Sequence, residues 1–137
     1  ASGCASYAGI PLTHRDYSQA CIFVTGHLRD GTVNLNWEML AHEKQTLIFY
    51  MGMHGSKIIC EELIKHGLSN ETPAALIVKG TTEDQEVIIG NLKNMPEIIM
   101  DRKIVPPTLL IIGDVVKLHN KLKWFNPFHL GNKNLHI

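Results

Sequence analysis

Two glycine-containing segments each follow a short apolar run, and this placement suits the binding of a small ligand. Met51 ends the apolar run 47–51, which leads into a loop over residues 52–55, and Gly80 follows the apolar residues 74–78. In open α/β sheets, ligands bind beyond the carboxyl ends of the strands, and glycine lets the backbone approach a ligand closely. Either glycine segment could equally be a turn that serves only backbone geometry. The first loop is not the dinucleotide-binding fingerprint, because that motif's third glycine and later acidic residue are lacking.

A polar motif near the start of the chain carries side chains that suit carboxylate binding. It reads Thr13-His14-Arg15-Asp16. The planar fork of arginine captures a carboxylate with two parallel hydrogen bonds, and a protonated histidine can assist. The alternative is a solvated loop in which these side chains meet no ligand. The motif is not a kinase catalytic loop, since the downstream residues that such a loop requires are absent.

Composition argues against several other classes of partner. The formal net charge is zero, so nothing indicates a nucleic acid as partner. The eight histidines and three cysteines form no Cys-x-x-Cys or His-x-x-x-His pair, so we expect no metal site. Three widely spaced cysteines are no disulfide framework and favour a reducing compartment. The apolar runs are far shorter than the ~20 residues that span a bilayer. We therefore expect a cytoplasmic location without membrane contact.

Alternating apolar and amphipathic segments predict the elements that position these residues. Asn36 and Ser56 are expected as N-caps of two helices, and Gly67 is expected just beyond the end of the second. This pattern predicts a three-layer α/β domain, and short loops allow some antiparallel pairing, so we expect a mixed five-stranded sheet. The expected strands cover residues 20–25, 47–51, 74–78, 85–90 and 108–112, and the expected helices cover residues 37–43, 57–66 and 96–102.

The ordered set of motifs resembles the C-terminal half of the uroporphyrinogen-III C-methyltransferases, which also form the methyltransferase module of siroheme synthases in the tetrapyrrole methylase family. The likeness runs over residues 1–125. It rests on residues 9–17 (Gly-Ile-Pro-Leu-Thr-His-Arg-Asp-Tyr), 50–52 (Tyr-Met-Gly), 79–82 (Lys-Gly-Thr-Thr) and 121–125 (Lys-Leu-Lys-Trp-Phe). The resemblance implies S-adenosylmethionine-dependent methylation of uroporphyrinogen III to precorrin-2, for siroheme or cobalamin biosynthesis. It also implies S-adenosylhomocysteine as product, a homodimer and no metal.

The resemblance also implies roles for individual residues. The position of Met51 lines the adenosine pocket, chiefly through its backbone, and Gly80 permits close approach to the adenosine. Thr108 is the residue expected to line the cofactor from a third segment. His14 and Arg15 are expected to face the carboxylates of the substrate, or to shape the dimer contact beside that site.

The chain departs from the family pattern in ways that limit what it could do alone. Neither the Gly-x-Gly-x-Asp signature nor the Gly-Asp-Pro segment of the family's first half occurs. Those parts contact the methionine moiety of the cofactor and supply the catalytic base, so the base stays unassigned and we expect an inactive fragment. Residues 1–17 are expected to join a missing N-terminal half, residues 18–125 to form the subdomain, and residues 126–137 to be a polar tail. Glu86 occupies a position where the family often has a basic residue.

Two alternative functions remain open at this point. The first is a related methylase with another substrate, such as a different tetrapyrrole, a ribosomal RNA ribose or diphthamide. The second is a non-catalytic fragment that only dimerises or binds a nucleotide. The neutral charge speaks against ribosomal RNA, and Thr13-His14-Arg15 speaks for uroporphyrinogen.

Overall fold

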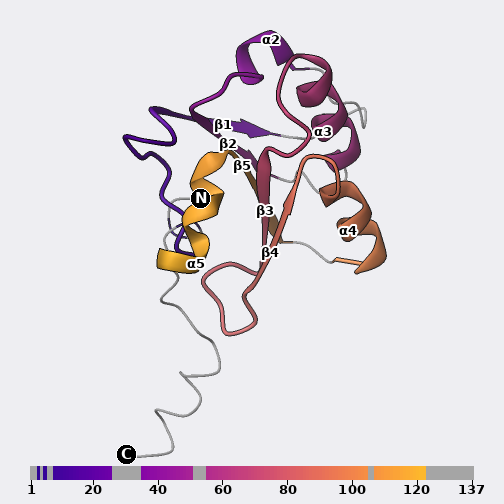
Figure 1. Cartoon of the computed structure of the whole chain (residues 1–137). Coiled ribbons are helices and arrows are strands. Elements are labelled where there is room, and N and C mark those ends of the chain that lie inside the picture. Colours follow the sequence, from indigo (N-terminus) through magenta and orange to yellow (C-terminus); the bar gives the residue numbers. More distant parts are fainter. Residues whose placement is uncertain are drawn as a thin grey trace, which may run out of the picture.

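The centre of the fold is a mixed five-stranded sheet with the strand order β1-β2-β5-β3-β4 (Figure 1). The computed structural model describes residues 3, 5, 8–25, 35–50, 55–104 and 107–122. The strands are β1 (Ala20–Thr25), β2 (Gln45–Tyr50), β3 (Pro73–Val78), β4 (Glu86–Asn91) and β5 (Thr108–Ile112). The helices are α2 (Trp37–Leu40), α3 (Ser56–Lys65), α4 (Met95–Asp101), α5 (His119–Leu122) and the 3₁₀ helix η1 (Asp114–Leu118).

The strand directions define two opposite ends of the sheet, which we name as edges by the strand termini that lie there. β1 and β2 are parallel, whereas β5 lies antiparallel between β2 and β3, and β4 is antiparallel to β3. Strands β1, β2 and β3 therefore all end at one edge, which we call the carboxyl edge. They all begin at the other, which we call the amino edge.

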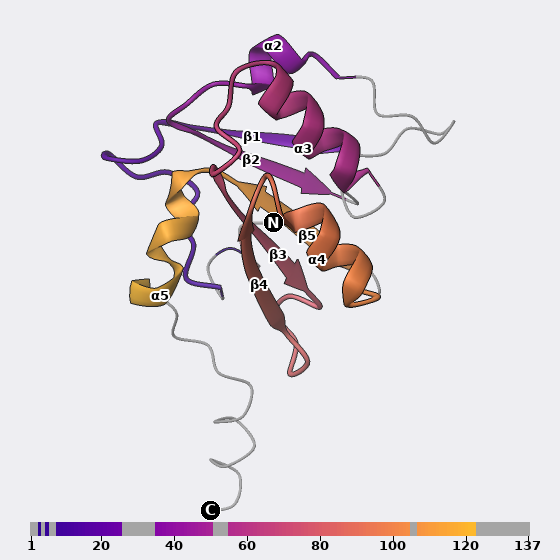
Figure 2. The ribbon, with the colours of Figure 1, turned by 45° about the vertical axis from the view of Figure 1, so that its right-hand side comes forward.

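Helices and an N-terminal segment cover the two faces of the sheet. One face packs against α2, α3 and α4, with Leu47, Leu76 and Leu110 in the middle of its core. The other face packs against η1 and the segment that contains Ala8 and Ile10. Figure 2 shows α3 and α4 on one side of the sheet and α5 on the other. This arrangement confirms the predicted three-layer α/β fold, and each buried aliphatic side chain in it contributes about 1.5–3 kcal/mol.

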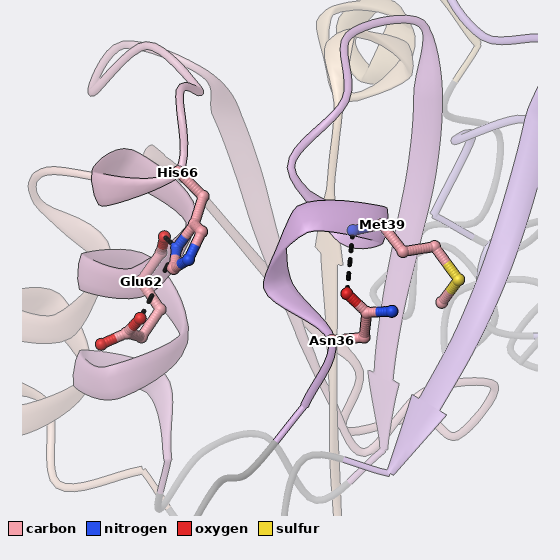
Figure 3. A network of polar contacts seen from close by, with 4 residues as sticks. All are labelled: Asn36, Met39, Glu62 and His66. Atoms are coloured by element: carbon pink, nitrogen blue, oxygen red, sulfur yellow. Dashed lines mark hydrogen bonds and ion pairs between the residues drawn. The ribbon is translucent and has the colours of Figure 1, made fainter.

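Local hydrogen bonds explain where the helices begin and end. The Asn36 side chain accepts a bond of 3.3 Å from the Met39 N–H, which confirms the predicted N-cap of α2 (Figure 3). At the end of α3, the ring Nδ1 of His66 lies 2.8 Å from the Glu62 carbonyl oxygen. Gly67 follows with a φ of 118°, so the glycine predicted beyond this helix is confirmed.

Two predictions about helices were wrong, and two short helices were not predicted. α2 ends at Leu40 rather than at residue 43, because the Gln45 side chain donates hydrogen bonds to its last carbonyl groups. Ser56 is not an N-cap: Gly55 takes that position, since its carbonyl already accepts from the Ile59 N–H at 2.9 Å. The short helices η1 and α5 were not predicted. None of the helices in the described ranges is long and apolar enough to cross a bilayer.

Candidate functional site

Three chain segments predicted to bind one ligand meet at the carboxyl edge. Tyr50 is the last residue of β2, and it pairs with Leu109 of β5. The neighbouring Thr108 begins β5 and pairs with Val78, the last residue of β3. The sequence continues from Val78 to Gly80 after one residue. Met51 itself lies outside the described residues, although Tyr50, which precedes it, is placed at this edge.

The loop after β3 has an unusual backbone. Lys79 has a φ of 48° and Thr81 a φ of 67°, so two non-glycine residues in left-handed conformations flank the half-buried Gly80. Such a conformation costs roughly 1–2 kcal/mol for each residue that has a Cβ atom. Lys44 and Lys103 have a similar left-handed φ elsewhere in the described residues, so the loop after β3 is distinguished by two such residues on either side of one glycine.

Side chains from the same loop hold this strained backbone. The Thr82 hydroxyl donates to the Lys79 carbonyl at 2.6 Å, and the Gln85 side-chain oxygen accepts from the Thr81 N–H at 2.9 Å. The Lys79 N–H donates to the carbonyl of Pro107 at 3.0 Å, which ties the loop to the residue before Thr108. Each strained residue therefore has a backbone group bonded to a side chain across the loop.

The His14 motif forms a closed turn. His14 and Ser18 exchange two backbone hydrogen bonds of 2.7 and 2.8 Å, and the Tyr17 ring lies 5.1 Å from the His14 ring. The Asp16 N–H donates to Nδ1 of His14 at 3.2 Å. Nδ1 of His14 therefore acts as a hydrogen-bond acceptor in this turn. Arg15 is exposed to solvent.

Two buried hydroxyls anchor this turn at the amino edge. The Thr46 hydroxyl donates to Ser18 Oγ at 2.7 Å, and Ser18 Oγ donates to the carbonyl of Ala20, the first residue of β1. The Gln19 N–H, just before β1, donates to the carbonyl of Lys44, just before β2, at 2.8 Å. The loop next to β1 therefore lies at the strand end opposite the arrowheads of β1 and β2 (Figure 2). Strands of this length span roughly 17–20 Å. His14 and Arg15 thus lie at the opposite edge from Gly80 and Thr108, and the structure does not bring the two pairs together.

Comparison with known proteins identifies the family of this chain. The family model of the tetrapyrrole (corrin/porphyrin) methylases matches residues 1–96. The chain belongs to the tetrapyrrole methylase family. A siroheme synthase of Thioalkalivibrio sulfidiphilus is 59% identical over 127 residues, which make up 93% of this chain and 26% of that relative. The chain therefore spans about a quarter of the length of the curated relatives that it matches.

Solved tetrapyrrole methylases share the fold. The uroporphyrin-III C-methyl transferase of Thermus thermophilus complexed with S-adenyl homocysteine is 26% identical to this chain with a TM-score of 0.68. The match covers 83% of this chain and 50% of that one. Cobalt precorrin-4 methyltransferase matches with a TM-score of 0.73 at 22% identity, over 83% of this chain and 48% of that enzyme, which supports the fold alone. The five-stranded mixed sheet is therefore the sheet of a tetrapyrrole methylase.

An aromatic pair beside the carboxyl edge was missed by the sequence analysis. The rings of Phe23 and Tyr50 stack with their centroids 6.3 Å apart, and both side chains are substantially exposed. Alternation along the two strands could have revealed them. Ile22 and Val24 pack against the core on the face that α2, α3 and α4 cover. Phe23 lies between them in the strand, so its side chain points to the opposite face.

Charge at the carboxyl edge is balanced locally. Glu86 begins β4 at this edge, and its Oε1 lies 2.9 Å from Nη1 of Arg102. Both side chains are more than half exposed, so the pair adds at most about 1 kcal/mol to stability. The Arg102 charge nevertheless offsets the negative charge that Glu86 brings to this edge.

The amino edge holds a cavity of about 360 Å³, which the sequence analysis did not predict. Its lining carries both charge signs, including Lys44, Glu71 and Asp114. Asp114 pairs with Lys117, also in the lining, at 3.5 Å. Because Gln45 and Pro73 begin their strands here, the cavity lies across the sheet from Gly80 and is not the predicted cofactor site.

Thiol and metal chemistry find little support in the described part of the chain. Burial and the nearby Glu61 raise the pKa of Cys60 to about 12, so its thiol stays protonated at neutral pH. Burial also raises the pKa of the Cys21 thiol. Over the described ranges, no three His, Cys, Asp or Glu side chains gather as a metal site would require.

Proposed function

We propose that this chain is the C-terminal subdomain of an S-adenosylmethionine-dependent C-methyltransferase that converts uroporphyrinogen III to precorrin-2. The observation that carries the proposal is the strand register, which sets the end of β2 and the end of β3 beside the start of β5. Ligands of open α/β sheets bind beyond such strand ends. The T. thermophilus C-methyl transferase that shares this fold was solved with S-adenyl homocysteine, which supports a cofactor of this class.

The residues at the carboxyl edge fit the adenosine part of that cofactor. Gly80 has no Cβ, so its backbone can meet a flat ligand closely, and the two strained neighbours keep that backbone in one conformation. The Met51 backbone and Thr108 would complete the pocket from two other strand ends. When bound, S-adenosylmethionine supplies an electrophilic methyl group. The contribution of this subdomain is to fix the position of the cofactor relative to a carbon of the substrate.

His14 and Arg15 would act at a distance from the methyl donor. They lie at the amino edge, so we assign them to substrate carboxylates remote from the reacting carbon, or to the contact between two subunits of a homodimer. The exposed Arg15 guanidinium offers a planar fork, and the bond from the Asp16 N–H to Nδ1 orients the His14 ring. A cytoplasmic enzyme of siroheme or cobalamin biosynthesis is the setting that this proposal implies.

The competing functions make different experimental predictions. A methylase for another substrate would bind S-adenosylhomocysteine but leave uroporphyrinogen III unchanged. A non-catalytic fragment would bind a nucleotide or dimerise without turnover in any context.

The test is methyl transfer from S-adenosylmethionine by the full-length protein that carries this sequence and by residues 1–137 alone. We expect precorrin-2 formation by the full-length protein and none by the isolated chain, because the other half of the fold positions the methyl group. A full-length protein that binds S-adenosylhomocysteine but leaves uroporphyrinogen III unmethylated would refute the proposed substrate.

A further inference from the structure

We propose that Thr82 and Gln85 are positioning residues that hold the Lys79–Gly80–Thr81 backbone in the conformation that binds the methyl donor. This inference rests on the proposed function and adds two side chains to it. Neither is placed against the ligand. Both act through the backbone of the loop between β3 and β4.

The first contact fixes the start of the loop. The Thr82 hydroxyl donates to the Lys79 carbonyl at 2.6 Å, and the Thr82 N–H donates to the same oxygen at 3.3 Å. Lys79 has the left-handed φ of 48°, a conformation that a lysine seldom adopts without support. The Thr82 hydroxyl therefore stabilises the orientation of the peptide unit that leads into Gly80.

The second contact fixes the other side of Gly80. The Gln85 side-chain oxygen accepts from the Thr81 N–H at 2.9 Å, and the Gln85 N–H donates to the Thr82 carbonyl at 3.1 Å. The bond from the Thr81 N–H to the Gln85 side chain holds the peptide unit between Gly80 and Thr81, and Thr81 itself has a φ of 67°. The two peptide units adjoining the half-buried glycine are thus each held by one side chain.

The contacts of this loop reach beyond the loop itself, so Thr82 and Gln85 do more than stabilise a turn. A loop that served only as a turn could have glycine or asparagine at its two left-handed positions, because these residues adopt that conformation at little cost. The sequence places lysine and threonine there, and the Lys79 N–H is bonded to the Pro107 carbonyl at 3.0 Å. The held conformation therefore also sets the distance between Gly80 and the start of β5, where Thr108 lies.

The chain offers a closely matched control at the amino edge. The Thr72 hydroxyl donates to the carbonyl of Ser69, three residues earlier, at 2.7 Å. This is the same bond that Thr82 makes with Lys79, but it lies in the loop before β3, away from the carboxyl edge. Both Thr72→Val and Thr82→Val remove a threonine–carbonyl bond, and Thr82→Val also removes the 3.3 Å bond that the Thr82 hydroxyl accepts from the Asp84 N–H. Comparison of the two variants separates loop stability from cofactor binding.

The experiment is calorimetric titration of S-adenosylhomocysteine into the full-length protein and its variants, with a thermal melt of each. Thr82→Val and Gln85→Met should each raise the Kd at least tenfold. Thr82→Ser and Gln85→Glu keep the hydroxyl or the acceptor oxygen and should restore binding to within about threefold. Thr72→Val should lower the melting temperature and leave the Kd unchanged.

Steady-state kinetics add a readout that a structural role would not move. The KM for S-adenosylmethionine should rise in Thr82→Val and Gln85→Met, while the KM for uroporphyrinogen III stays at the wild-type value. Folded variants that bind S-adenosylhomocysteine as tightly as wild type would overturn the inference and leave the proposed function intact. A wild-type protein that binds no S-adenosylhomocysteine would overturn both.

Discussion

Thr108 and Val78 pair across the antiparallel strands β5 and β3, so the first residue of one strand lies beside the last residue of the other. Leu109, next in β5, pairs with Tyr50 at the end of β2. Segments that are far apart in the sequence thus meet at the carboxyl edge. This relationship explains how residues from three loops can contact one ligand.

Arg15→Ala should weaken substrate binding more than turnover. A carboxylate contact far from the reacting carbon is equally strong in the ground state and the transition state, so its loss raises KM with little change in kcat. Loss of a charged hydrogen bond costs about 1.5–3 kcal/mol, which corresponds to roughly one to two decades in KM. Steady-state kinetics on uroporphyrinogen III would measure this effect.

The control for Arg15→Ala is Lys65→Ala, which removes an exposed positive charge from the end of α3. We expect Lys65→Ala to keep the wild-type KM. If Arg15→Ala also behaves like wild type, the closed turn from His14 to Ser18 has only a structural role.

Met51→Leu should leave cofactor affinity within a few-fold of wild type. If this position contacts adenosine through its main chain, a swap between apolar side chains of similar volume costs less than about 1.5 kcal/mol. Titration with S-adenosylhomocysteine measures the change. A loss greater than tenfold would mean that the methionine side chain itself makes the contact.

Gly113→Ala should destabilise the protein more than Gly67→Ala does. Both glycines have positive φ, but a Cβ at Gly113 would lie 3.0 Å from the Gln45 carbonyl oxygen, whereas one at Gly67 has nothing within 4 Å. The strained conformation alone costs roughly 1–3 kcal/mol, and the close contact adds to it. Urea denaturation would compare the two, and equal losses would show that the Gln45 backbone moves aside freely.

Stability should fall at alkaline pH because of Cys60. Its pKa is raised to about 12 in the folded protein by burial and by Glu61, from an ordinary value of 9.0. Between these values the unfolded chain releases the thiol proton while the folded protein keeps it, so unfolding becomes easier as pH rises. Between pH 9 and the folded-state pKa, each pH unit therefore lowers the free energy of unfolding by about 1.4 kcal/mol. Cys60→Ala should have a flatter dependence in urea denaturation, and an unchanged slope would contradict this assignment.

Much of the fold could be predicted from local sequence. Strands β1 and β5 have the predicted bounds because β-branched and other apolar residues fill them without interruption, and Gly113 ends the second. The helix η1 was missed because Val115 and Val116 favour strands, while their burial against the sheet depends on tertiary packing. Ser56 was misassigned because the Gly55 carbonyl starts α3 one residue earlier.

The candidate site was less predictable than the fold. The glycine after β3 was predicted from a strand end and from the resemblance, and the threonine that begins β5 was predicted from the resemblance. The left-handed conformations of Lys79 and Thr81 have no sequence signature, since they depend on hydrogen bonds from Thr82 and Gln85. The separation of His14 from this edge depends on strand direction, which local sequence does not encode.

The most direct test of the cofactor site is Gly80→Val, measured by titration of S-adenosylhomocysteine beside a thermal melt in the full-length protein. A valine Cβ would occupy the space where backbone meets ligand, so we predict a folded protein without detectable affinity. Gly67→Ala is the control, because it strains the backbone away from the carboxyl edge and should lower the melting temperature without changing affinity. A folded Gly80→Val protein with lower melting temperature and wild-type affinity would contradict the assignment of this edge as the cofactor site.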